Sequence, residues 1–247
     1  TRSIWVTGVQ TCALPISLTG ASNNARRLQQ TTGDGLSLFR RGLSWLLRPL
    51  HRFLVVRTTV ADPWEPATSF LITHHRFGMG SARPFSWYFE GTSTVAVSSV
   101  EEICDWLAHC QYVRDPVLFR EPDYWQHPLT FEQLRKGDCE DYALWAWRKL
   151  HELGIPAELY VGQWQPQPDR GGFHAWVVFE QAGHRYVMEP ATKEPGRAVS
   201  PFDKVRDNYV PHFSVDASFR MCARAGLLLS WRNEELARRT KRSSDAA

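Results

Sequence analysis

The stretch Gly137-Asp-Cys-Glu-Asp-Tyr-Ala143 decides the fold of this chain. Asp138 is a helix-capping residue, and Asp141 follows it at the three-residue spacing of a capping box. Gly154 is a natural helix stop further along. We therefore predict a helix over residues 139–153 that has Cys139 as its first residue.

Three strands are predicted after this helix, over residues 157–163, 173–180 and 185–189, because their apolar and β-branched residues alternate. A symmetric hairpin about Ala182-Gly183 would place Trp176 opposite Glu189. Glu189 would then lie diagonally across from His174, about 7–8 Å away between backbones, which a glutamate side chain can span. A shift of one residue in the register would turn Glu189 to the other face of the sheet.

Cys139, His174 and Glu189 are the candidate catalytic residues. The start of a helix favours a thiolate through its unpaired N–H groups and its dipole, so Cys139 is placed as a nucleophile. His174 would act as the base, and Glu189 would orient the imidazole and stabilise its charged form.

The residues around Cys139 create an electrostatic problem. Asp138, Glu140 and Asp141 are acidic, and by themselves they would raise the pKa of the thiol. Helix capping by Asp138, a nearby imidazolium, or a hard cation such as calcium bound by these carboxylates would offset that effect. The alternative interpretation is that acidic residues are normal in a first helical turn.

Three segments carry a family resemblance: Gly137–Ala143, Gly171-Gly-Phe-His-Ala-Trp176 and Met188-Glu-Pro190 resemble the transglutaminase-like superfamily, and its bacterial cysteine-peptidase branch most. The resemblance covers residues 98–192. It implies an α+β fold with a papain-like or transglutaminase-like core, in which the nucleophile begins a helix packed on an antiparallel sheet. The family order is Cys, His, Asp, and this chain has Glu189 where the family usually has Asp.

The resemblance also bears on calcium. Some periplasmic members that cleave surface adhesins bind calcium near the cysteine motif, which here would implicate Asp138, Glu140 and Asp141. No other cofactor is expected.

The predicted function is that of a thiol-dependent hydrolase of the cysteine peptidase or amidase type, acting through an acyl-enzyme on a protein, peptide or small amide. Transglutaminase-type acyl transfer to an amine, an inactive binding or scaffold protein, and a zinc site built from the same three residues stay as alternatives. Trp125, Gln126 and Trp176 are candidates for lining the substrate site or binding an oxyanion. Packing of aromatic residues on the core is the competing interpretation.

The composition restricts the class of protein. The chain has 247 residues, of which 43% are hydrophobic and 22% charged, as in an ordinary soluble globular protein. A net charge of +3 gives no reason to expect nucleic acid as a partner. No apolar run reaches the roughly 18 residues of a transmembrane helix. Apart from Cys12, the cysteines are too scattered for a disulfide scaffold, and we expect reduced thiols.

The chain is expected to divide into four parts. Residues 1–17 read like the translation of a sequencing-adapter oligonucleotide, so we expect the natural amino terminus to be missing and leave the compartment open between cytoplasm and periplasm. Residues 18–35 are a polar, flexible lead-in, 36–232 a single domain, and 233–247 a charged C-terminal tail. A basic amphipathic helix is predicted over 36–47, and contact of residues 36–48 with a membrane surface is the alternative to core packing. A strand is predicted over 53–60 and helices over 100–110 and 130–134.

Overall fold

The computed structural model describes residues 53, 57, 62–67, 83–167 and 170–244. They belong to two compact units, of which one comprises Asp62–Leu227 and the other includes Phe53, Arg57 and the residues from Leu228 onward. The expectations for residues 1–17, 18–35 and 36–48 lie outside the described residues.

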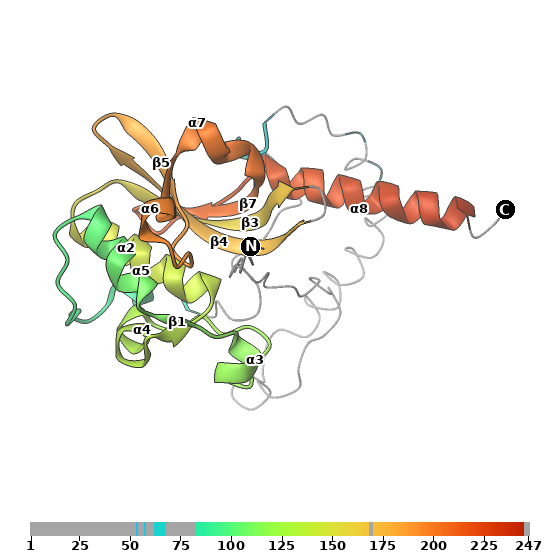
Figure 1. The fold of residues 1–247 in the computed structure, drawn as a ribbon. Coiled ribbons are helices and arrows are strands. Elements are labelled where there is room, and N and C mark those ends of the chain that lie inside the picture. Colours follow the sequence, from blue (N-terminus) through green and yellow to red (C-terminus); the bar gives the residue numbers. More distant parts are fainter. Residues whose placement is uncertain (1–52, 54–56, 58–61, 68–82, 168–169, 245–247) are drawn as a thin grey trace, which may run out of the picture. The chain divides into compact units, whose positions relative to one another are not determined.

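One antiparallel sheet forms the centre of the first unit (Figure 1). In sheet order its strands are β6 (Val199–Pro201), β5 (His184–Met188), β4 (Arg170–Gln181), β3 (Ala157–Gln167), β7 (Tyr209–Val215) and β8 (Met221–Ala223). All neighbouring strands in it run antiparallel. A separate short parallel pair joins β1 (Gln111–Tyr112) to β2 (Lys136–Gly137).

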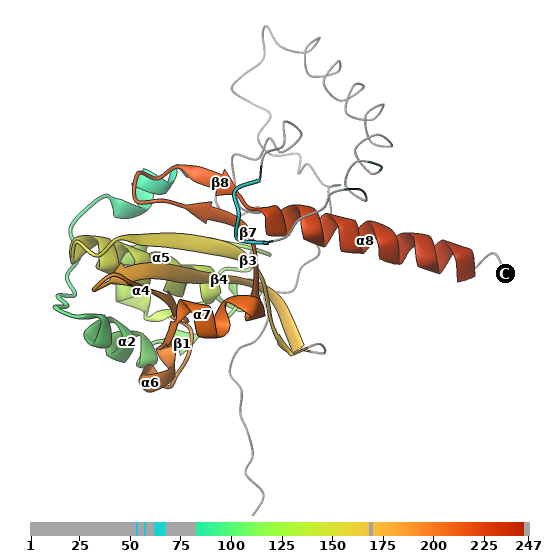
Figure 2. The same cartoon turned by 90° about the horizontal axis from the view of Figure 1, so that it is seen from above.

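The helix α5 (Cys139–Glu152) packs against β4 and β3, and it is contacted in turn by α4 (Pro128–Leu134) and α2 (Val100–Ala108). Figure 2 shows these helices gathered beside the sheet. The short elements are η1 (Phe85–Phe89), α3 (Asp115–Leu118), α6 (Pro195–Ala198), α7 (Phe202–Val205) and η2 (Arg206–Asn208). The fold is α+β, as predicted, with a cysteine at the start of a helix packed on an antiparallel sheet.

The ends of α5 follow from its sequence. Asp138 is the N-cap residue in a capping box with Asp141, and its backbone N–H donates to Asp141 Oδ2 at 3.2 Å. Gly154, with φ of +71°, takes the left-handed conformation that ends many helices. The predicted helix, its cap and its stop are therefore confirmed, with the end of the helix one residue before the predicted one.

The hairpin between β4 and β5 has the predicted register. Gln181 pairs with His184, and the pairing continues to Val177 opposite Met188. Ala182 and Gly183 have φ of +51° and +77°, so both central residues of the turn are left-handed, as in a type I′ turn. The twist of such a turn matches that of the strands it joins, and this fixes the face on which each following residue lies.

An apolar cluster covers the sheet face that carries Trp176. The cluster is formed by Trp64, Tyr160, Trp176, Val178, Val187, Phe202 and Tyr209. Ring centroids of Trp176 lie 6.0 Å from Tyr160 and 4.8 Å from Tyr209. Aromatic contacts of this kind hold the side chains of β4 in fixed positions.

The two ends of the first unit are hydrogen-bonded to each other. Ala67 donates its backbone N–H to Ala223 at 2.8 Å, and Ala225 donates to Glu65 at 2.8 Å. Arg224 adds side-chain bonds to the carbonyl of Trp64 and to Glu158 Oε2. The segment 62–67 is thereby attached where α8 (Ala225–Ser244) begins.

Other parts of the structure differ from the prediction. Phe53 and Arg57 are helical, and the Arg57 guanidinium lies 4.2 Å from the Phe53 ring centroid, so the strand predicted there is wrong at both described positions. A four-residue spacing brings such a pair together on a helix but not on a strand. The strands β6, β7 and β8 were not predicted, and α8 begins at Ala225, eight residues before the start of the predicted charged C-terminal tail. Within the described residues, none of the helices combines the length and apolar character needed to cross a bilayer.

Candidate active site

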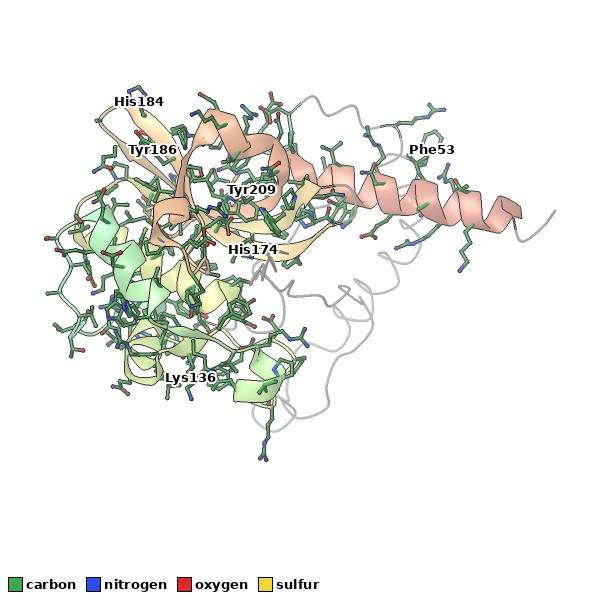
Figure 3. The ribbon with its side chains drawn as sticks, in the orientation of Figure 1. Phe53, Lys136, His174, His184, Tyr186 and Tyr209 are labelled. Atoms are coloured by element: carbon green, nitrogen blue, oxygen red, sulfur yellow. The ribbon has the colours of Figure 1, made fainter. Side chains whose placement is uncertain are left out.

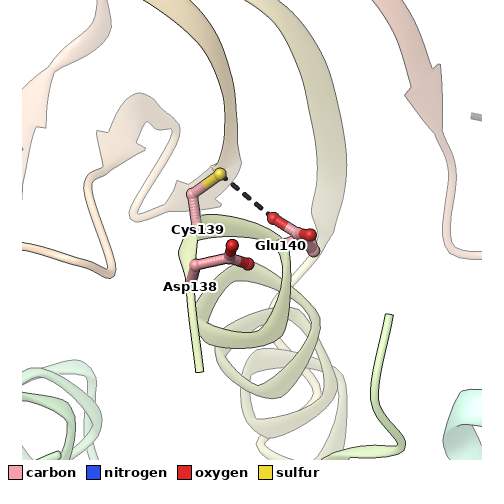
Figure 4. A group of neighbouring side chains, drawn as sticks. All are labelled: Asp138, Cys139 and Glu140. Carbon is pink, nitrogen blue, oxygen red and sulfur yellow. Dashed lines mark hydrogen bonds between the residues drawn. The ribbon is translucent and has the colours of Figure 1, made fainter. Parts of the chain in front are cut away.

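Cys139 lies at the first position of α5, where its side chain is buried. Its thiol donates a hydrogen bond to Glu140 Oε2 at 3.2 Å, with the Asp138 carboxylate beside them (Figure 4). Because α5 packs against β4, the nucleophile candidate is carried on a helix that contacts the strand of His174. A carboxylate that accepts a hydrogen bond from a thiol favours the neutral thiol over the thiolate, which is the electrostatic problem expected from the sequence.

His174 and Glu189 are hydrogen-bonded to each other. His174 Nε2 lies 2.7 Å from Glu189 Oε2, and His174 is 3% exposed. The carboxylate accepts, so Nε2 carries the hydrogen and the lone pair of a neutral ring is on Nδ1. The sequence analysis placed His174 and Glu189 on the same face of the sheet, and this hydrogen bond agrees with that placement.

Tyr209 is the third member of this chain of hydrogen bonds, and Figure 3 labels it together with His174. Its hydroxyl donates to Glu189 Oε1 at 2.5 Å. Burial, and then the charge of Glu189, raise the pKa of Tyr209 well above its usual range, so the phenol keeps its proton. Each carboxylate oxygen of Glu189 thus has a partner of its own.

Two indole rings lie close to the His174 imidazole. The Trp176 ring centroid is 6.4 Å away with an interplanar angle of 22°, and the Trp164 centroid is 6.0 Å away. Trp176 has 0% exposure and packs in the core beside His174. Its position in the strand places it inside the aromatic cluster, and its role at the substrate site stays a prediction.

Trp125 and Gln126 have partners within the fold. The Trp125 indole N–H donates to Asp123 Oδ1 at 3.1 Å. The Gln126 side-chain amide donates to the Lys136 carbonyl at 2.8 Å and to Asp141 Oδ2 at 2.5 Å. These bonds use both amide hydrogens, so Gln126 anchors Asp141 and has no amide hydrogen left for an oxyanion.

Gly137 is constrained by the same contacts. A Cβ atom added to it would overlap the Asp141 carboxylate and the Gln126 amide. The glycine that precedes Asp138 in the motif therefore lets these groups close over the start of α5.

The carboxylates near Cys139 form a cluster larger than the three predicted from the sequence. Ligand-type atoms lie within 4.8 Å of one another in Asp138, Cys139 and Glu140; in Asp115, Asp138 and Asp141; and in Asp115, Asp123 and Glu140. Asp138, Glu140 and Asp141 are thus joined through shared neighbours. Asp115 is the first residue of α3, and Asp123 lies in the segment that follows α3.

Burial shifts the ionisation of this cluster. It raises the pKa of Asp115 to about 7, with the charge of Asp138 as the second cause. Burial and the charge of Asp138 also raise the pKa of Asp141 well above its usual range. Asp115 Oδ1 and Asp138 Oδ1 are buried without a hydrogen-bond partner among the described residues. Buried carboxylate oxygens without a hydrogen-bond partner fit a hard cation, and without one they favour protons.

Sequence reasoning did not single out Tyr209, Asp115 or Asp123 as site residues. Asp115 and Asp123 lie within residues 98–192, which the family resemblance covers, and that was a usable signal. The sequence around Tyr209 gave no such signal, because Tyr209 comes near Glu189 only through the pairing of β7 with β3.

Comparison with known proteins finds a family similarity in the central part of this chain. Residues 88–189 match the family model of the transglutaminase-like superfamily. A search of curated proteins gave no match.

Solved structures with some similarity come from bacteria. A candidate cysteine protease of Cytophaga hutchinsonii is 17% identical, with a TM-score of 0.36. The similarity covers 55% of this chain and 43% of that one. This chain thus spans less than half of the length of that protein. Calcium-bound LapG of Legionella pneumophila is 18% identical with a TM-score of 0.40, over 62% of this chain and 86% of LapG. An EGTA-treated LapG structure, 16% identical over 62% of this chain and 85% of that one, has a TM-score of 0.38.

Proposed function

We propose, from the match of residues 88–189 to the transglutaminase-like family model, that this protein is a thiol-dependent hydrolase of amide bonds in proteins or peptides. Cys139 is the nucleophile, His174 the general base and Glu189 the residue that orients the base. The hydrogen bond of 2.7 Å between His174 Nε2 and Glu189 Oε2 is the observation that supports this proposal most strongly.

The proposed reaction uses the tautomer that this bond selects. His174 Nδ1 takes the thiol proton of Cys139, and the thiolate attacks the substrate carbonyl. Backbone N–H groups at the start of α5 stabilise the oxyanion, and the imidazolium gives its proton to the leaving amine. Water then releases the acid from the thioester with His174 again as the base.

Glu140 opposes this reaction while it accepts the hydrogen bond of the Cys139 thiol, because a negative charge there disfavours the thiolate, and we propose that a calcium ion changes its role. Asp115, Asp123, Asp138 and Glu140 would hold the ion, since their oxygens belong to overlapping groups of close ligand atoms and two of the oxygens are buried without partners. The chemistry that bound calcium would supply is a positive charge next to the sulfur, which offsets the carboxylates.

The test of the hydrolase proposal is acylation by p-nitrophenyl acetate in the presence of calcium. Wild type is expected to release a burst of nitrophenolate, and intact mass analysis is expected to find an acetyl group on Cys139. Cys139→Ala should abolish the burst, and His174→Ala should slow acylation by about a hundredfold or more. Cys222→Ala is the matched control, because Cys222 lies on β8 outside the site.

Two further measurements separate the alternatives. Iodoacetamide at pH 6 should label Cys139 faster than Cys222, and His174→Ala should remove the difference. If Cys139 and Cys222 are labelled at equal rates and His174→Ala changes neither rate, a binding or scaffold protein is the better interpretation. A methylamine chase of the acetylated enzyme that gives mainly N-methylacetamide instead of acetate would favour acyl transfer.

A further inference from the structure

We infer that Tyr209 is a positioning residue of this site, which holds the Glu189 carboxylate in the orientation that serves His174. The inference rests on the proposed function, because it assigns Tyr209 a part in the action of His174.

The division of the Glu189 carboxylate between two donors is the first argument. Oε1 accepts from the Tyr209 hydroxyl at 2.5 Å, while Oε2 accepts from His174 Nε2 at 2.7 Å. A carboxylate held at one oxygen can rotate about its last bond. Held at both oxygens, its plane is fixed, and Oε2 stays directed at the imidazole.

The length of the glutamate side chain is the second argument. Glu189 has one methylene more than aspartate, and therefore one more rotatable bond to immobilise. The residue follows the end of β5, where the ladder with β4 has stopped at Met188. A second attachment is needed there to hold a longer and freer side chain, and the Tyr209 hydroxyl provides it.

The direction of the Tyr209 hydrogen bond is the third argument. Tyr209 also has a side-chain hydrogen bond with Trp164, its partner in the pairing of β7 with β3. An indole N–H is only a donor, so the phenol oxygen accepts from Trp164 and must direct its own hydrogen to Glu189. Four neighbouring strands thus contribute to one chain of hydrogen bonds. Trp164 comes from β3, Tyr209 from β7 and His174 from β4, while Glu189 follows the end of β5.

Packing is the competing explanation, since the Tyr209 ring belongs to the aromatic cluster and is 3% exposed. Removal of the hydroxyl alone separates the explanations, because Tyr209→Phe keeps the ring. Tyr160→Phe is a matched control: Tyr160 is 2% exposed in the same cluster, but its hydroxyl bonds to Glu158 Oε2 at 2.7 Å, away from His174.

The experiment compares the full-length variants with p-nitrophenyl acetate. Tyr209→Phe is expected to lower the acylation rate at saturating ester about tenfold with KM unchanged, as for a lost hydrogen bond to a charged group. Tyr160→Phe should stay within about twofold of wild type. In a Glu189→Ala background Tyr209→Phe should add nothing further, because Tyr209 acts through Glu189.

A proton NMR measurement tests the same inference without any reaction. The His174 Nε2–H resonance, identified by its loss in His174→Gln, should broaden through solvent exchange in Tyr209→Phe and persist in Tyr160→Phe. A resonance and an acylation rate in Tyr209→Phe equal to those of Tyr160→Phe would overturn the inference. If Cys139→Ala still acylates normally, the proposed function fails, and the NMR comparison alone decides the role of Tyr209.

Discussion

At the scale of single residues, Asp115, the first residue of α3, connects the segment after α3 to the start of α5. Its Oδ2 accepts from the backbone N–H of Tyr124 at 2.5 Å, while its backbone N–H donates to Asp138 Oδ2 at 3.3 Å. The remaining oxygen, Oδ1, is buried without a hydrogen-bond partner among the described residues. This residue therefore tests the calcium proposal better than the acidic residues of the cysteine motif.

Calcium is expected to stabilise the wild-type protein against heat and to do so much less in Asp115→Asn. At a calcium concentration 100 times its dissociation constant, the gain would be about 2.7 kcal/mol. Asp105→Asn, which changes an exposed aspartate on α2, should keep the full gain. Scanning calorimetry in EGTA, in calcium and in magnesium measures this thermal stabilisation for each protein. Equal shifts in both variants, or no shift in wild type, would contradict calcium binding at this cluster.

The residues of the site differ in how far the sequence could reveal them. Cys139 and its cap belong to one local motif, and His174 and Glu189 belong to one hairpin, so short-range rules locate them. Tyr209 lies on a strand whose partner, β3, is more than forty residues earlier in the chain. No local pattern encodes such a pairing, and the hydroxyl that reaches Glu189 could not be predicted from it.

At the scale of elements, the turn between β4 and β5 is less favourable than it could be. Ala182 has a positive φ, which costs a residue with a Cβ about 1 kcal/mol or more. Asparagine tolerates this conformation and is preferred before glycine in type I′ turns.

Ala182→Asn is therefore expected to raise the free energy of unfolding by about 0.5–1 kcal/mol, and Ala182→Val to lower it. Urea unfolding at equilibrium measures the change. Gln181→Asn is the control, since Gln181 is an exposed neighbour outside the left-handed residues. A stabilisation by Gln181→Asn as large as that by Ala182→Asn would contradict an origin in the turn.

Elements with strong local signals were predictable, and elements held by distant partners were not. The helix α5 has a cap, a stop and an apolar sequence between them, and the hairpin has a short turn. By contrast, β6 and β8 have three residues each and exist through pairing at the two edges of the sheet. Phe53 and Arg57 show the opposite error, because an alternating β-branched pattern suggested a strand where the residues are helical.

At the scale of the whole molecule, a buried imidazole makes stability depend on pH. Burial lowers the pKa of His212 on β7 to about 4, from about 6.5 in an unfolded chain. Between these values the unfolded chain binds a proton that the folded protein does not. Stability from this residue is therefore complete above about pH 6.5 and decreases as the pH falls toward 4.

His212→Phe is expected to lose less stability than wild type on acidification, by about 3 kcal/mol between pH 6.5 and 4. Urea unfolding at several pH values gives this difference. His184→Gln, which changes an exposed histidine at the hairpin, should follow the wild-type curve. Parallel curves for wild type and His212→Phe would show that His212 titrates normally in the folded protein.

The hydrogen bonds between segment 62–67 and the start of α8 have a consequence for chain connectivity. Because Ala67, Glu65 and Pro63 are bonded to Ala223, Ala225 and Gly226, the two ends of the first unit are neighbours in space. Its backbone is nearly a closed ring. A circular permutation that joins Leu227 to Asp62 by a short linker and opens the chain at Ala182-Gly183 would keep every strand pair of the sheet, with Cys139 and His174 in one continuous segment.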